Sequence, residues 1–182
     1  MNIAGKFLRK LVSEKTVLFN KKFFVTSGVI IVCFLLDRLS KIYIINRFVE
    51  NDFKDQIINK FLNFTLIWNK GIAFGLFQSE NFFYIFISFV ILSIIVFIIF
   101  LIVRSESLPE AVCFSMITGG ALGNFFDRFY YNAVPDFIDL HYENLHWFTF
   151  NVSDICITTG IIFLLIFDMF KFNKKKTNEK KF

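Results

Sequence analysis

The chain has 182 residues, of which 55% are hydrophobic and 29 are Phe, and it carries a formal net charge of +5 at pH 7. A soluble domain of this size cannot bury so much apolar surface, whereas a membrane protein exposes it to lipid. Basic residues gather in 1–22 and 171–182, as in cytoplasmic flanks of membrane helices, and we expect no nucleic-acid partner. The composition therefore excludes a soluble globular protein and favours an integral membrane protein.

The first apolar segment lies between Lys22 and Asp37 and contains only fourteen uncharged residues. A membrane crossing needs roughly 20 residues, so this helix must continue through Asp37 and Lys41 and is predicted at about 23–45. Asp37 and Lys41 are four residues apart, which is the spacing of an ion pair on one helix face. The polar and basic stretch before the segment is too long for an ordinary cleaved signal peptide, so we expect this helix to be retained.

The next segment, 46–80, mixes acidic and basic side chains. Within it, 61–68 has the composition of a strand, and the motif NKGIAFG at 69–75 is typical of a turn. The segment 81–103 then contains no charge at all and is long enough to cross the membrane. It is predicted as the second transmembrane helix.

A third apolar segment has sixteen uncharged residues between Glu110 and Asp127, so its helix, predicted at about 109–128, reaches an acid at the membrane edge. Gly119 and Gly123 form a GxxxG pattern in this segment. Such small residues let helices approach closely in lipid, so the pattern predicts tight helix packing.

The fourth apolar segment has thirteen uncharged residues between Asp154 and Asp168 and is predicted as a helix at about 150–170. The connection before it, 129–149, is predicted as an outer loop that contains VPDFIDLHY.

The basic ends indicate an orientation for these helices. Both ends in the cytoplasm require an even number of crossings, so the first and third helices run outward. Asp37, Asp127 and Asp154 then all lie at the outer ends of their helices. The predicted fold is an all-α integral membrane protein of four transmembrane helices, with its acidic residues gathered at the extracytoplasmic face.

Asp136 and Asp154 are the candidate reactive acids, because neither has a cationic neighbour in the sequence. Asp127, in contrast, precedes Arg128 and shares a helix face with it and with Asn124, which favours a structural ion pair. Two carboxylates in a poorly hydrated site share one proton, so one can accept a proton from water while the other polarises a carbonyl. The residues alone leave open the alternative of two separately solvated acids at the membrane interface.

The ordered motifs DRLSK, NKGIAFG, GGALGNFFDR, VPDF and FNVSD, within about 25–170, closely resemble those of lipoprotein signal peptidase, or signal peptidase II. The resemblance implies a bacterial inner-membrane aspartic endopeptidase without a cofactor. Such an enzyme removes the signal peptide from prolipoproteins and cuts before a cysteine that carries a diacylglyceryl group. The resemblance also implies inhibition by the cyclic peptide globomycin.

Carried onto this chain, the resemblance implies that Asp136 and Asp154 form the catalytic dyad. It implies that 46–80 forms a small extracytoplasmic sheet that cradles the substrate. Pro135 stands where the family usually has Val, and Ser153 where it usually has Ala. The residues implied to bind substrate or support the site are Asp37, Lys41, Asn69, Gly71, Asn124, Asp127, Arg128 and Asn151.

Other classes of protein fit the pattern less well. A transporter or proton-conducting protein would place its acids at several depths, and a structural scaffold would explain the glycines but not the acids. Metal chemistry is not predicted, because the chain has only two histidines and no HExxH motif. The three cysteines, in apolar segments at unrelated spacings, are expected to be unreactive thiols.

Overall fold

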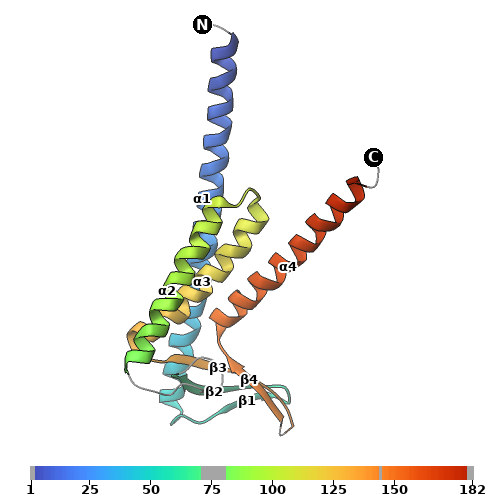
Figure 1. The fold of residues 1–182 in the computed structure, drawn as a ribbon. Helices are drawn as coiled ribbons and strands as arrows, with labels where there is room; N and C mark the ends of the chain where they lie inside the picture. The colour runs from blue at the N-terminus through green and yellow to red at the C-terminus, as the bar shows by residue number, and fades with distance from the viewer. Residues whose placement is uncertain (1–2, 71–80, 144, 180–182) are drawn as a thin grey trace.

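A computed structural model of the chain describes residues 3–70, 81–143 and 145–179, and it combines a helical bundle with a small sheet. The helices are α1 (Ile3–Glu50), α2 (Asn81–Arg104), α3 (Leu108–Tyr131) and α4 (Val152–Glu179). Figure 1 shows that they alternate in direction, with the sheet at one end of the bundle. The beginning of α1 and the end of α4 both lie at the opposite end.

Among the described residues, three helical segments are long and apolar enough to cross a membrane: Asn20–Glu50, Ile85–Arg104 and Val152–Phe172. Their apolar side chains face outward; Phe89 and Phe97 on α2, for example, are 67% and 58% exposed. Lipid, unlike water, solvates such surfaces without a free-energy cost, so this exposure is what a membrane protein requires.

The predicted third crossing also forms a helix, α3, which contacts α1, α2 and α4. Ser107 caps its N-terminus by accepting a hydrogen bond from the Glu110 backbone N–H, and Asn132 ends it in the left-handed conformation. Its buried residues are mostly small or polar, as expected of a helix whose side chains meet protein on three sides.

The glycines of α3 confirm the prediction of close helix packing. A Cβ atom built on Gly119 would lie 2.7 Å from the Cβ of Cys33 on α1, and one on Gly120 would lie 2.5 Å from the Ser153 carbonyl oxygen. These separations are far inside van der Waals contact, so only glycine lets α1 and α4 approach α3 this closely.

The sheet contains β1 (Gln56–Asn59), β2 (Leu62–Asn69), β3 (Val134–Tyr142) and β4 (Leu145–Phe150), all antiparallel and in this order. The strand predicted near 61–68 is confirmed as β2. The prediction of a loop at 129–149 is wrong, because this segment supplies β3 and β4, which make up half of the sheet. Two acidic residues of β3, Asp136 and Asp139, are buried in the structure, and in the sequence they were typical of a loop.

The sheet is fastened to the bundle through the end of α1. Ile44 and Phe48 on α1 form a buried cluster with Phe137 on β3. The helix therefore continues to Glu50, beyond the predicted end near 45, because its last two turns support the sheet. At the other end of the chain, α4 continues as a helix to Glu179. The cluster places Asp136, the neighbour of Phe137, directly over the end of the bundle.

Candidate active site

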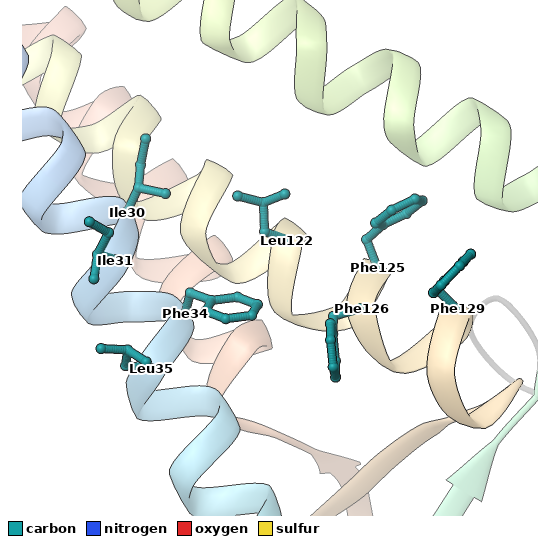
Figure 2. A pocket seen from close by; sticks show the side chains of 8 residues that line it. All are labelled: Ile30, Ile31, Phe34, Leu35, Leu122, Phe125, Phe126 and Phe129. Atoms are coloured by element: carbon teal, nitrogen blue, oxygen red, sulfur yellow. The ribbon is translucent and has the colours of Figure 1, made fainter.

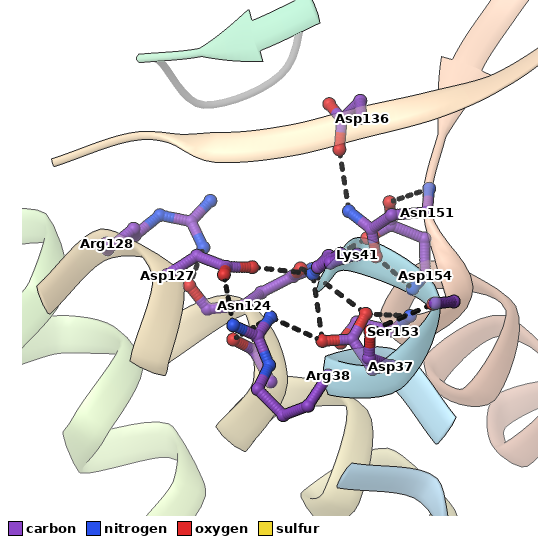
Figure 3. A network of polar contacts seen from close by, with 12 residues as sticks. Asp37, Arg38, Lys41, Asn124, Asp127, Arg128, Asp136, Asn151, Ser153 and Asp154 are labelled. Atoms are coloured by element: carbon purple, nitrogen blue, oxygen red, sulfur yellow. Dashed lines mark hydrogen bonds and ion pairs between the residues drawn. The ribbon is translucent and has the colours of Figure 1, made fainter. Parts of the chain in front are cut away.

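Four acidic residues from four different elements lie where the bundle meets the sheet (Figure 3). They are Asp37 on α1, Asp127 on α3, Asp136 on β3 and Asp154 on α4. Asp37 and Asp127 are fully buried, Asp136 is 5% exposed, and Asp154 is partly buried. A carboxylate removed from water needs a cation or hydrogen-bond donors to stabilise its charge, and the four acids obtain them in two different ways.

Asp37 and Asp127 are neutralised by two basic residues of α1. The Lys41 ammonium lies 2.8 Å from Asp37 and 2.6 Å from Asp127, and the Arg38 guanidinium lies 2.7 Å and 2.5 Å from the same two carboxylates. The predicted pair of Asp37 with Lys41 is confirmed. Two acids and two bases make the cluster neutral overall, and each charge has an opposite partner within hydrogen-bonding distance.

The partners of Asp127 differ from those suggested by the sequence. The sequence favoured its neighbour Arg128, but Asp127 pairs with Arg38 and Lys41 across the contact between α1 and α3. Arg128 donates to the backbone carbonyl of Asn124 at 3.0 Å. Arg38 was missed, although it is adjacent to Asp37, because adjacent residues on a helix point in different directions. Only the position of α3 shows that Arg38 reaches the cluster.

Asp136 is surrounded by neutral donors. The Asn151 side-chain amide donates to it at 2.6 Å, and the Asn69 amide donates at 3.0 Å. Burial raises the pKa of Asp136 from 3.8 to about 6, against the opposing effect of the two amide hydrogen bonds, and the charge of Asp154 raises it further. Asp136 is therefore a carboxyl group that can hold a proton near neutral pH.

Asp154 lies in the first turn of α4, where the backbone N–H groups have no acceptor within the helix. Its carboxylate accepts from the Asn151 backbone N–H at 3.1 Å, while the Asn151 side-chain oxygen accepts from the Asp154 N–H at 3.2 Å. This reciprocal pairing resembles a capping box and fixes both side chains at the helix start.

Asn151 connects the two acids. It is fully buried, and it donates to Asp136 with its side-chain amide while its backbone N–H donates to Asp154. Both candidate catalytic acids from the sequence are thus bound by one residue, although one acid belongs to a strand and the other to a helix. The contact with Asn69, from β2, brings a third segment into the same site.

Asn124 connects this pair to the ionic cluster. Its side-chain oxygen accepts from Lys41 at 3.1 Å, and its amide nitrogen donates to Asp154 at 2.8 Å. An ammonium group can only donate, so Lys41 fixes which end of the amide faces Asp154. The ionic cluster therefore orients a donor toward a candidate catalytic acid.

The two departures from the family pattern lie beside the site and are both buried. Ser153 uses its backbone N–H, which donates to Asp37 at 2.9 Å, so this contact does not depend on the side chain. Pro135 pairs with Trp68 of β2 at the start of β3, where a missing N–H donor is tolerated. Gly71, the remaining predicted site residue, lies outside the described residues.

Two hollows accompany the site. A groove of about 320 Å³ opens beside Asp154 and is lined by Phe148 and Phe150 on β4 and by Ile155, Thr158 and Thr159 on α4. A wholly hydrocarbon-lined cavity of about 400 Å³ lies between α1 and α3 (Figure 2). It has no titratable lining residue, so of these two hollows the first combines space for a ligand with a group that can react.

Within the described part of the chain, no three His, Cys, Asp or Glu side chains are arranged to hold a metal ion.

The raised pKa of Asp136 predicts how stability depends on pH. Between roughly pH 4 and pH 6 the folded protein binds a proton that the unfolded chain has released, so wild-type stability falls as the pH rises through this range. Asp136→Asn removes this dependence, and above pH 6 it should raise the free energy of unfolding by at most about 3 kcal/mol.

Thermal unfolding of the purified wild type and variant at about pH 4.5 and about pH 7.5 measures the effect. The stabilising effect of Asp136→Asn should be present at the higher pH and smaller at the lower one. The exposed acid Asp52 provides the control Asp52→Asn. An equal effect of Asp136→Asn at both pH values would contradict the assignment.

The chain is similar in sequence to proteins of one known family. The family model described as signal peptidase (SPase) II matches residues 29–171. A lipoprotein signal peptidase of Pelagibacter ubique is 47% identical over 161 residues, which cover 88% of this chain and 96% of the relative. A lipoprotein signal peptidase of Coxiella burnetii is 41% identical over 137 residues, which cover 73% of this chain and 82% of the relative.

Two solved structures, both described as bacterial membrane enzymes, share the fold. One superposes with a TM-score of 0.64 and 24% identity, covering 86% of this chain and 92% of the other. The second superposes with a TM-score of 0.59 and 25% identity, covering 81% and 91%. The combination of apolar helices with a small antiparallel sheet is therefore the fold of known membrane enzymes.

Proposed function

This chain belongs to the signal peptidase II family, and we propose that it is an aspartic endopeptidase that removes signal peptides from diacylglyceryl-modified prolipoproteins by cutting before the modified cysteine. The observation that carries this proposal is the position of Asn151, which binds Asp136 and Asp154 together at the mouth of the bundle. Acids and amides alone can perform such a hydrolysis, because two carboxyl groups sharing one proton supply both an acid and a base.

The environment of Asp136 supports a division of roles between the two acids. Asp136 holds the shared proton, since burial raises its pKa to about 6, and it donates to the oxygen of the scissile carbonyl. Asp154 acts as the base and takes a proton from the attacking water while the water oxygen bonds to the carbonyl carbon. Transfer of that proton from Asp154 to the cysteine nitrogen breaks the C–N bond, and one hydroxyl of the former carbonyl carbon returns a proton to Asp136. The products are a carboxylic acid on the signal peptide and a free amine on the cysteine, and the dyad again holds one proton.

The remaining site residues support this reaction. Asn69 and Asn151 orient Asp136, and Asn124 orients Asp154. Asp37, Lys41 and Asp127 hold Asn124 and the helices in place, while the groove beside Asp154 receives an apolar part of the substrate. We expect Gly71 and Arg128, as the family resemblance implies, to contribute to substrate binding.

The membrane arrangement belongs to the same proposal. We propose that α3 also crosses the membrane, which makes four crossings in all, because it packs along α1, α2 and α4 and runs between the same two ends of the bundle (Figure 1). Residues 1–22 and 171–182 are then cytoplasmic, 23–170 form the peptidase domain, and the sheet lies outside a bacterial inner membrane. The basic character of both ends supports this orientation.

Cleavage by the purified protein tests the function. We expect cleavage of a precursor that carries the diacylglyceryl group, little cleavage of the unmodified precursor, and inhibition by globomycin. A metal chelator should have no effect. Replacement of all three cysteines, which are buried in apolar helices, by Ala should leave the rate within about threefold of the wild type, because the proposed reaction uses two carboxyl groups and no thiol. Loss of activity with a chelator and its recovery with added zinc would contradict the aspartic mechanism.

A further inference from the structure

A second polar cluster lies on the sheet, away from the dyad. Asp139 on β3 is 3% exposed, and its carboxylate accepts from the Nδ1 atom of His146 on β4 at 2.8 Å. The ring of His141 stacks on that of His146, with a centroid distance of 5.4 Å, and its Nδ1 lies 4.0 Å from the same carboxylate. A buried carboxylate is costly without a donor, so this arrangement needs an explanation that the proposed reaction does not supply.

The hydrogen bond spans an irregularity in the pairing of β3 with β4. Leu140 pairs with Phe148, but the next residue, His141, pairs with His146, so Trp147 is an extra residue on β4. An extra residue of this kind is a β-bulge, which reverses the faces on which the following side chains lie. Trp147 itself is 87% exposed.

The bulge is what brings His146 to Asp139. In a strand, residues two apart share a face, so Asp139 and His141 lie on one face of β3. Without the bulge Trp147 would pair with His141, and His146 would lie on the opposite face of the sheet. The hydrogen bond between Asp139 and His146 therefore exists only in the observed register.

This register matters because both strands carry parts of the candidate active site. Asp136 lies three residues before Asp139 on β3. On the other strand, β4 ends at Phe150 and is followed immediately by Asn151, which binds both Asp136 and Asp154. Only the four residues 147–150 separate His146 from Asn151. A shift of β4 along β3 would move Asn151 relative to Asp136.

We propose that Asp139 and His146 form a cross-bulge staple, a pair of positioning residues that fixes β4 in register and so aligns Asp136 with Asn151 and Asp154. The effect of the staple on rate rests on the proposed function, whereas its effect on the sheet does not. Neither residue touches the reacting groups, and each acts through the strand to which it belongs.

Three variants separate the staple from simple loss of a histidine. His146→Leu removes the donor, while His146→Asn retains an N–H donor near the position of Nδ1. His141→Leu is the matched control, because it removes a histidine that faces the same carboxylate, together with its ring contact to His146, but leaves the hydrogen bond between Asp139 and β4 in place. Each purified variant is assayed for kcat and KM and for hydrogen exchange of the backbone amides in 134–150.

We expect His146→Leu to lower kcat at least about tenfold with KM within about twofold, because small misplacements of reacting groups cost rate rather than binding. Exchange in 134–150 should rise, while exchange in α2 stays unchanged. His146→Asn should restore both kcat and protection to within about threefold, and His141→Leu should change kcat less than about threefold.

Unchanged kcat and exchange in His146→Leu would overturn the staple, as would equal losses in His146→Asn or in His141→Leu. A different result separates the two proposals. If neither the wild type nor any variant cleaves the precursor, but exchange in 134–150 rises in His146→Leu and recovers in His146→Asn, the proposed function fails and the role of the staple in strand register stands.

Discussion

Asp136→Asn and Asp154→Asn are each expected to lower kcat for precursor cleavage by at least about 1,000-fold while the amount of folded protein stays near that of the wild type. Each substitution removes one of two groups that act as a unit, the acid or the base, so the double variant should be little worse than either single one. The measurement is single-turnover cleavage by purified protein, normalised to folded protein.

The matched control for these variants is Asp168→Asn, an exposed acid near the far end of α4. It changes the same charge on the same helix as Asp154 and should cleave at the wild-type rate. Normal cleavage by Asp136→Asn or by Asp154→Asn would show that the dyad is assigned to the wrong residues.

Asp127→Asn is expected to act on stability instead. It leaves Lys41 and Arg38, which are 1% and 8% exposed, with two positive charges facing the single carboxylate of Asp37. Removing one partner from a buried ionic cluster typically costs about 3–5 kcal/mol, so little folded protein should remain in the membrane.

The conservative variant Asp127→Glu keeps the charge and should retain more folded protein than Asp127→Asn. Thermal unfolding of the detergent-solubilised variants, together with their amounts in the membrane, measures the difference. A stable but inactive Asp127→Asn protein would contradict a structural role and would place Asp127 among the reacting groups.

Much of the site could be predicted from the sequence, because an acidic residue that borders a short apolar segment must lie at the edge of the membrane, where its charge costs least. The segments ending at Asp37 and Asp127 and beginning at Asp154 were too short to cross without their acids, and the structure brings those acids to one end of the bundle. The local pair of Asp37 with Lys41 could also be predicted, since it depends only on helix periodicity.

The parts that could not be predicted depend on contacts between distant segments. Arg38 reaches Asp127 only because Gly119 and Gly123 let α1 and α3 approach closely. The strand β3 resembled a loop because Asp136 and Asp139 are acidic, and acids are rarely buried in a sheet. Their burial becomes understandable only when Asn151 and His146, which follow later in the chain, are seen to satisfy them.

Hydrolysis by Asp136 and Asp154 of the peptide bond before a lipid-modified cysteine defines both products of the reaction. The most direct test is the intact mass of both products after the purified protein acts on a diacylglyceryl-modified precursor. We expect a signal peptide that ends at the residue before the cysteine and a second product that begins with the lipidated cysteine bearing a free amine. Asp154→Asn should form neither product. Products cut at another bond, or the same products from Asp154→Asn, would contradict this expectation.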